Sequence, residues 1–115
     1  MTIIETGNNK DFVSSLDKKY RNLLLYARIS TLAMLNYYGK DGLSYQDIKD
    51  TLKLEDGSLA PNLRWLKNHR YIRSEDAEVD KKTLVVYYIE DNGRKAYNDI
   101  ESWLSRILHL GDQKG

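Results

Sequence analysis

Two apolar stripes at helical spacing, separated by a turn, constrain the fold of this 115-residue chain most strongly. Both lie within residues 42–72. Ser44, followed three residues later by Asp47, is typical of a helix start, because the serine oxygen can accept a hydrogen bond from an early helical N–H. The stripes consist of Tyr45, Ile48 and Leu52, and then of Leu59, Leu63 and Leu66. This spacing predicts two short helices joined by a turn over residues 53–57.

The only proline, Pro61, indicates where the second helix begins. A proline inside a helix lacks the N–H that would bond to the carbonyl four residues earlier. With Asp56 as the N-cap, Pro61 would be the fifth helical residue and this hydrogen bond would be lost. With Ser58 as the N-cap, Pro61 falls in the first turn, where the N–H has no partner in any case. We therefore predict that Ser58 caps a helix that runs to Asn68.

The N-terminal third of the chain is also predicted to be helical. Residues 1–10 lack periodicity and are expected to form a flexible arm. Apolar side chains then recur at three- and four-residue steps, which predicts one helix or two consecutive helices over 11–38. A single helix of that length would be long for a globular protein, so we expect a break near residues 19–22.

After residue 68 the hydrophobic period changes. β-branched and aromatic residues predict a β-hairpin over 71–89, with a charged loop at 76–82. A broad apolar stripe then predicts a last helix over 91–110. The expected fold is mainly α with a small β-hairpin, in one domain that spans residues 1–115.

Composition argues against catalysis and against a metal site. The chain has no cysteine, and its two histidines, His69 and His109, are isolated, so we expect neither zinc nor thiolate chemistry. It has no nucleophile–base set and no phosphate loop, so we expect no enzyme and no cofactor. It also has no leader and no apolar run of the roughly 20 residues that a bilayer requires, so the expected location is the cytoplasm.

One motif carries a resemblance to a known family. It reads LSYQDIKDTLKLEDGSLAPNLRWLKNHRYI and is followed by a charged hairpin and then by IEDNGRKAY. This order resembles winged helix-turn-helix transcriptional regulators of the MarR and ArsR type, especially compact bacterial and archaeal members, over Arg28 to Leu108. The chain departs from the family pattern at Ile89 and Glu90, where a leucine–threonine pair is usual. The resemblance implies that the hairpin is a wing and that the partner is double-stranded DNA.

The second helix of the motif is expected to enter the major groove, which an α-helix fits. The net charge of +1 is too small to argue for DNA binding, but residues 58–74 carry four basic side chains and no acid. Arg64 is the best candidate to read a guanine, Asn62 could read adenine, and Pro61 or Ala60 could touch a thymine methyl group. The residues expected at the DNA are Tyr45, Ser58, Ala60, Pro61, Asn62, Arg64, Trp65, Lys67, Arg73, Lys81 and Lys82.

Several of these assignments have alternatives. Trp65 could pack against the wing or a helix, Arg64 could pair with an acid of its own chain, and Asn62 could be a solvated helix position. Lys81 and Lys82 are surrounded by acids, so the wing is nearly neutral and is expected to contact DNA less strongly than the helix does. The main alternative function is a winged helix that docks a protein partner instead of a specific DNA sequence.

The terminal helices suggest a homodimer. Apolar residues in both are expected to form its interface: Phe12, Leu16, Tyr20, Ile100, Trp103, Leu104, Ile107 and Leu108. Alternatively, these side chains cover the core of a single protomer. A dimer would present two such helices about 34 Å apart and so prefer a pseudo-palindromic site. The tyrosines Tyr20, Tyr26, Tyr37 and Tyr38 could line a small-molecule effector pocket, but ordinary core and interface packing is the preferred explanation for them.

Overall fold

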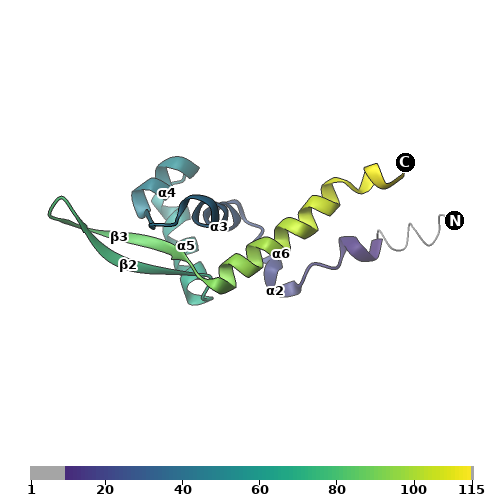
Figure 1. Ribbon diagram of the computed structural model, residues 1–115, viewed down its shortest axis with the longest axis horizontal. Helices are drawn as coiled ribbons and strands as arrows, with labels where there is room; N and C mark the ends of the chain where they lie inside the picture. Colours follow the sequence, from purple (N-terminus) through teal and green to yellow (C-terminus); the bar gives the residue numbers. More distant parts are fainter. Residues whose placement is uncertain (1–9, 115) are drawn as a thin grey trace.

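The chain is mainly α-helical with a small antiparallel sheet, as the sequence predicts (Figure 1). The computed structural model describes residues 10–114. The helices are α2 (Lys18–Arg21), α3 (Tyr26–Tyr38), α4 (Tyr45–Leu52), α5 (Asp56–Asn68), α6 (Asp91–Leu108) and the 3-10 helix η1 (Leu110–Lys114). The strands are β1 (Leu43–Ser44), β2 (Ile72–Val79) and β3 (Lys82–Ile89), in the spatial order β1–β3–β2. The wing and the C-terminal end of α6 lie at opposite ends of the molecule.

Helix α4 begins where the sequence predicts. The Ser44 hydroxyl oxygen accepts a hydrogen bond from the Asp47 N–H at 3.0 Å, which satisfies one of the free donors of the first turn. The helix ends at Lys53, which has a left-handed backbone conformation with φ of 57°. Only residues 53–55 separate α4 from α5, so the turn is shorter than the predicted 53–57.

The predicted start of α5 at Ser58 is wrong, because the helix begins at Asp56 with Glu55 as its N-cap. The Asp56 carboxylate accepts a hydrogen bond from the Tyr45 hydroxyl at 2.7 Å and lies 3.1 Å from the Lys49 ammonium. These two contacts with α4 stabilise an earlier first turn. Pro61 therefore lies inside the helix, and the hydrogen bond that it omits would have gone to a carbonyl at an exposed position.

The helical run is interrupted close to the break predicted near residues 19–22, but twice instead of once. Helix α2 occupies most of that range, and the helical run is interrupted on either side of it, at 14–17 and at 22–25. Asp17 caps α2, since its carboxylate accepts from the Lys19 N–H at 3.0 Å. Of the predicted flexible arm, residues 1–9 lie outside the described residues, and Lys10 belongs to a helical turn.

The hairpin has the predicted extent, but its two strands are longer than predicted, and the assignment of residues 76–82 to a loop is wrong. Strand β2 continues to Val79, and β3 begins at Lys82. Only Asp80 and Lys81 form the turn, with φ of 52° and 67°. Positive φ at both residues is typical of a type I′ turn, whose twist matches that of two paired strands. The acidic residues of β2 are compatible with a strand because they are exposed to solvent.

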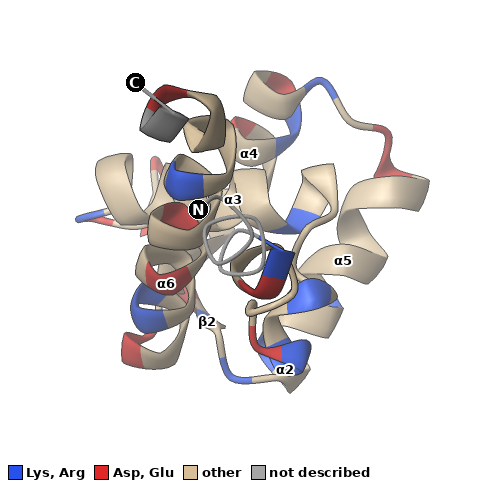
Figure 2. Ribbon diagram, turned by 90° about the vertical axis from the view of Figure 1, so that its right-hand side faces the viewer, with Lys and Arg blue, Asp and Glu red and all other residues tan. Residues whose placement is uncertain are grey.

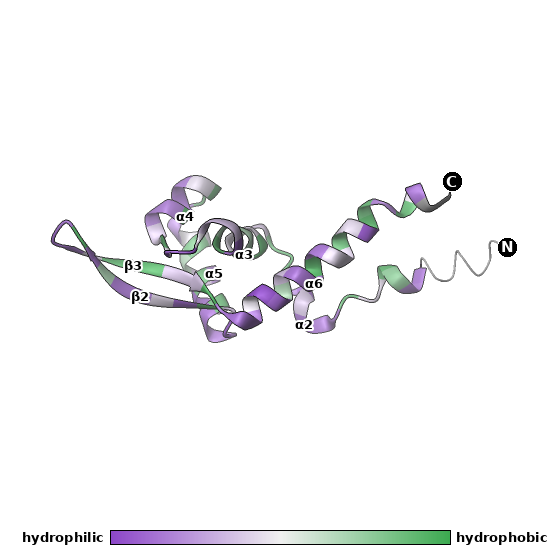
Figure 3. Ribbon diagram, viewed as in Figure 1, coloured by the Kyte–Doolittle hydropathy of each residue, from purple (hydrophilic) through white to green (hydrophobic). Residues whose placement is uncertain are grey.

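The core lies where α3, α4, α5, the sheet and the first half of α6 meet. Its fully buried side chains are Leu23, Thr31, Leu32, Leu35, Ile48, Leu59, Leu63, Leu66 and Ile100. Figure 3 shows that apolar residues also continue along α6 beyond this core. Helix α6 starts close to the end of α5, because Gly93 lies against the Tyr71 carbonyl and leaves no room for a Cβ atom. Within residues 10–114, no helix has both the length and the apolar character needed to cross a membrane.

Candidate nucleic-acid interface

Helix α5 presents a polar face on the side opposite its buried leucines. Pro61, Arg64 and Asn68 are exposed there, and Ala60 beside them is half-buried. Arg64 forms no ion pair and no side-chain hydrogen bond with any described residue, so pairing with an acid of its own chain is not observed. The guanidinium is therefore free to meet a ligand from solution.

Asn62 and Trp65 lie on a flank of α5, against α3. The Arg28 Nε of α3 donates to the Asn62 side-chain oxygen at 2.8 Å, and its guanidinium carbon lies 3.8 Å from the centre of the Trp65 ring. The His69 ring also stacks on Trp65, with ring centres 3.8 Å apart. Trp65 therefore packs within its own chain, and Asn62 is already hydrogen-bonded. Their expected base contacts are not supported by this geometry.

Tyr45 and Ser58 differ in their availability for a phosphate contact. The Tyr45 hydroxyl donates to Asp56, and burial together with this hydrogen bond raises the pKa of Tyr45 to about 12. The same hydrogen bond and the nearby Lys49 lower the pKa of the Asp56 carboxyl. Tyr45 thus joins α4 to α5. Ser58 is exposed in the first turn of α5, where backbone N–H groups favour anions.

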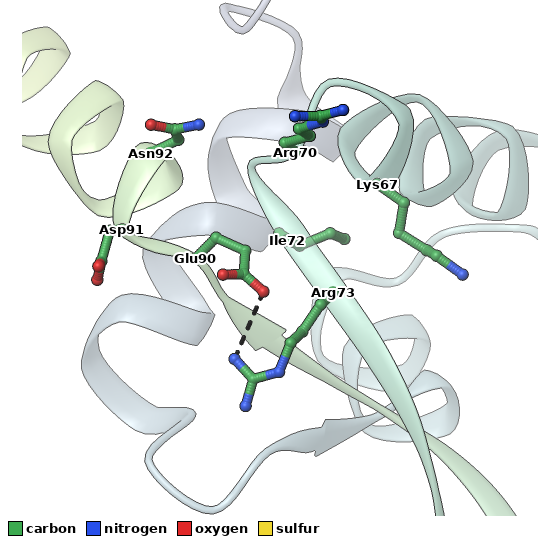
Figure 4. A pocket seen from close by; sticks show the side chains of 7 residues that line it. All are labelled: Lys67, Arg70, Ile72, Arg73, Glu90, Asp91 and Asn92. Carbon is green, nitrogen blue, oxygen red and sulfur yellow. Dashed lines mark ion pairs between the residues drawn. The ribbon is translucent and has the colours of Figure 1, made fainter.

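A hollow of about 420 Å³ lies where the end of α5 meets β2 and the start of α6 (Figure 4). Its lining residues are Lys67, Arg70, Ile72, Arg73, Glu90, Asp91 and Asn92. Arg73 turns toward Glu90, with 3.5 Å between the charged atoms, and its guanidinium also stacks on the Tyr88 ring at 4.4 Å. Arg73 is therefore largely engaged by its own chain.

Lys67 and Arg70 contribute positive charge beside this hollow. Both are exposed, and neither pairs with an acid among residues 10–114. Arg70 was absent from the residues expected at the DNA, although it belongs to the same acid-free basic stretch. Its backbone is left-handed, with φ of 63°, and it lies in the short connection between α5 and β2.

The wing tip carries both signs of charge. Lys81 lies in the turn and Lys82 opens β3, and both are exposed. Asp76, Glu78 and Asp80 are exposed on the same hairpin. The two lysines form no ion pair with a described residue, so they are available for a phosphate, but the surrounding acids reduce the local positive potential.

Half of the residues expected at a dimer interface pack within the protomer instead. Leu16, Tyr20 and Ile100 are buried in the core, and the Tyr20 hydroxyl donates to Asp99 at 3.2 Å. The Trp103 indole N–H donates to the backbone carbonyl of residue 12 at 3.2 Å. These four side chains therefore cover the core of a single protomer, which was the alternative to a dimer interface.

The other residues expected there remain accessible to different degrees. Leu108 is 71% exposed and Leu104 is 39% exposed, whereas Phe12 and Ile107 are half-buried. Leu104 and Leu108 line an apolar groove of about 350 Å³ between α3 and α6. Figure 2, which views the molecule along its long axis, shows acidic and basic segments alternating along α6.

The four tyrosines considered for an effector pocket do not share one. Tyr20 is in the core, Tyr26 donates to the Leu52 carbonyl, and Tyr38 points into solvent. The Tyr37 hydroxyl donates to Glu101 at 3.0 Å, which joins α3 to α6 and raises the pKa of Tyr37 to about 12. These positions favour individual packing roles over a common ligand site.

Comparison with known proteins places this geometry among DNA-binding folds. A family model described as a winged helix DNA-binding domain matches residues 27–108. A solved structure of a mutant of MepR from Staphylococcus aureus is similar with a TM-score of 0.74 at 17% identity, covering 98% of this chain and 80% of that one. An S. aureus MepR–DNA complex is similar with a TM-score of 0.70 at 17% identity, covering 96% of this chain and 87% of that one.

A PadR-like transcription factor from Bacteroides fragilis gives a TM-score of 0.63 at 19% identity, covering 85% of this chain and 95% of that one. No curated protein matches at the sequence level. At these identities the structural likeness is one of fold.

Proposed function

The chain belongs to the family of winged helix DNA-binding domains, and we propose that it is a transcriptional regulator that binds a specific double-stranded DNA sequence as a homodimer. The observation that carries the proposal is the exposed face of α5, where Arg64 stands opposite the buried leucines without a partner among the described residues. The fold it shares with the MepR–DNA complex supports the proposal.

In this proposal α5 enters the major groove. Arg64 donates two hydrogen bonds to a guanine, because its planar guanidinium matches the O6 and N7 acceptors of that base. Pro61 and Ala60 offer apolar contact to a thymine methyl group. Lys67 and Arg70 at the end of α5 contact phosphates, as does the exposed Ser58 at its start, and these contacts set the register of the helix on the duplex.

The wing makes a weaker contribution. Lys81 and Lys82 approach the phosphates beside the groove, while the acids of β2 limit how closely the hairpin is attracted. Phosphate contacts of this kind carry affinity for all sequences alike. Specificity therefore depends on α5.

The dimer would form through the C-terminal half of α6. Leu104 and Leu108 expose apolar surface there, next to the groove that they share with α3. A second copy that covers this surface would bury both leucines. We propose that the two-fold axis of this dimer directs both α5 helices toward the same duplex. The DNA site would then be a pseudo-palindrome whose half-sites lie about one helical turn apart.

Selection of bound duplexes from a random pool tests the proposal, and titration of the selected duplex against salt completes the test. We expect one enriched pseudo-palindrome, and an affinity that falls linearly on a log–log plot with a slope of about −0.9 per neutralised phosphate. No enrichment, together with a nearly flat salt plot, would contradict specific binding.

One observation favours the alternative function, a winged helix that docks a protein. The wing exposes Val79, Leu84 and Val85 between acidic side chains, and this composition suits a protein surface better than it suits a phosphate backbone. Substituting Leu84 and Val85 by serine would then abolish partner binding. Under the leading proposal the same substitutions leave the sequence preference intact.

A further inference from the structure

We propose that Arg28 is a positioning residue for DNA recognition: it fixes the rotation of α5 about its own axis and so determines which side chains face the DNA. Arg28 lies in the first turn of α3, outside the two-helix motif, and is half-buried. The inference rests on the proposed function and assigns a role to a residue that has no contact with the outward face of α5.

Arg28 contacts two other parts of the chain, α5 and the segment before α3. Its Nε donates to the Asn62 side-chain oxygen at 2.8 Å, and its Nη1 donates to the Asn22 carbonyl at 2.8 Å. Its guanidinium carbon lies 3.8 Å from the centre of the Trp65 ring. The planar guanidinium can bond through its edge while it stacks through its face, and lysine cannot do both. One side chain thus connects α3, the segment before it, and α5.

These contacts restrain rotation in a way that the leucine stripe does not. Asn62 and Trp65 are three residues apart, so they lie on one flank of α5, between the buried leucines and the outward face. Apolar contacts are non-directional, whereas hydrogen bonds and ring stacking depend on angle. Asn62 also donates to the Ser58 carbonyl at 2.7 Å, and His69 stacks on Trp65, so both groups that Arg28 holds are themselves fixed to α5.

A small rotation is enough to affect base reading. Side chains end about 5 to 6 Å from the axis of a helix, so a rotation of about 20° displaces them by about 2 Å. Hydrogen bonds weaken within a few tenths of an ångström and steeply with angle. A rotation of this size would therefore break a two-bond contact between Arg64 and a guanine while leaving α5 in the groove.

The test compares Arg28→Lys and Arg28→Ala with Arg94→Ala, a control that removes the same charge from an exposed position on α6. Each variant is titrated with the selected duplex and with duplexes changed at one base pair. We expect both Arg28 variants to lower discrimination between these duplexes about tenfold. This loss lies within the range of discrimination that a single two-bond base contact provides. Their salt slope should match that of the wild type and of Arg94→Ala.

A second readout does not depend on DNA. The chain has two tryptophans, so in a Trp103→Phe background all tryptophan emission comes from Trp65. Arg28→Lys should shift this emission and increase its quenching by acrylamide, because the stacked guanidinium no longer covers the ring. Arg94→Ala should leave both unchanged. If the wild type binds no duplex, the proposed function fails, while this measurement still decides whether Arg28 holds the flank of α5.

Two results would overturn the inference. The first is unchanged discrimination in Arg28→Lys. The second is an equal loss of affinity for every duplex in Arg28→Ala with a salt slope shallower by about 0.9, which would make Arg28 itself a phosphate contact. If Arg28→Ala does not fold, Asn62→Ala removes the hydrogen bond from Arg28, together with the one that Asn62 donates to the Ser58 carbonyl, and keeps the stacking of Arg28 on Trp65. That variant must then lower discrimination without changing the salt slope, and an unchanged discrimination would reject the inference.

Discussion

At the scale of single residues, the candidate DNA contacts differ in two respects: whether the side chain is exposed, and whether it already bonds to another residue of its own chain. Arg64 is exposed and has no partner among the described residues, whereas Arg73 pairs with two glutamates, Glu75 and Glu90. The leucine spacing was enough to predict that Arg64 faces outward. It was not enough to predict that Trp65 is covered, because the covering side chain, Arg28, lies in another helix and 34 residues before Asn62.

The first residue-scale prediction concerns base reading. Arg64→Ala should weaken discrimination at one base position by about 1 to 3 kcal/mol, because it removes a two-bond contact with a base edge. Lys81→Ala and Lys82→Ala should instead weaken binding to all sequences alike, since the contacts proposed for these two lysines are with phosphates, which carry no sequence information. Competition titrations with single-base-pair variants measure both effects. An equal loss for every sequence in Arg64→Ala would reject its reading role.

The second residue-scale prediction concerns pH. The Tyr45 hydrogen bond and Lys49 hold the pKa of the Asp56 carboxyl below its ordinary value of 3.8, so the folded state binds this proton less readily than the unfolded state. The resulting stabilisation is present above the ordinary pKa and is lost as the pH falls through the lowered one. Asp56→Asn should therefore reduce the urea midpoint at neutral pH more than at strongly acidic pH.

Asp76→Asn is the matched control, because Asp76 is exposed on β2 and forms no ion pair with a described residue. In Asp76→Asn, the difference between the urea midpoints at neutral and at strongly acidic pH should equal that of the wild type. A loss in Asp56→Asn that is equal at both pH values would show that the carboxylate charge does not stabilise the start of α5.

At the scale of helices and strands, periodicity predicted α3 to α6 and the hairpin, but it missed the short strand β1 and the 3-10 helix η1 and placed several ends wrongly. The start of α5 depends on contacts of Asp56 with Tyr45 and Lys49 of the preceding helix, which a local pattern does not contain. The strands of the wing were predicted too short because solvent-exposed acids interrupt the apolar alternation of a strand without interrupting its pairing. Local spacing therefore predicts which elements form, and tertiary contacts determine where they end.

Two glycines give a prediction at this scale. Gly93→Ala should destabilise the fold by about 1 to 3 kcal/mol, because the added methyl group meets the Tyr71 carbonyl where α6 begins. Gly57→Ala should instead stabilise it by about 0.5 to 1 kcal/mol, since its Cβ would lie in open space within a helix. Urea unfolding measures both changes. Equal effects would mean that the approach of α6 to Tyr71 is not tight.

At the scale of the whole molecule, the regions proposed for DNA contact and for dimer formation lie apart. The wing extends at one end of the molecule, and the C-terminal half of α6 lies at the other (Figure 1). Contacts such as Tyr37 with Glu101 join α3 to α6 and connect the two regions. Because the two regions share no side chain, a substitution in one leaves the side chains of the other in place. DNA binding and dimer formation can therefore be tested separately.

The prediction at this scale concerns assembly. Leu104→Glu combined with Leu108→Glu should convert a dimer to a monomer in sedimentation, because the new charges would have to be buried at the interface. Leu24→Glu is a matched control, since Leu24 is also an exposed leucine, 40% accessible, but lies before α3. Binding to a single half-site should survive in the double variant. A wild type that sediments as a monomer at all concentrations would contradict the proposed dimer.

Methylation protection shows whether Arg64 reads a guanine from the major groove. Dimethyl sulfate modifies the N7 of guanine, the atom that the Arg64 guanidinium would contact. On the selected duplex we predict one protected guanine in each half-site with the wild type. The same guanine should become reactive with Arg64→Ala at a concentration that saturates the DNA. Guanines that remain fully reactive with the wild type, or protection that persists in the variant, would contradict the account.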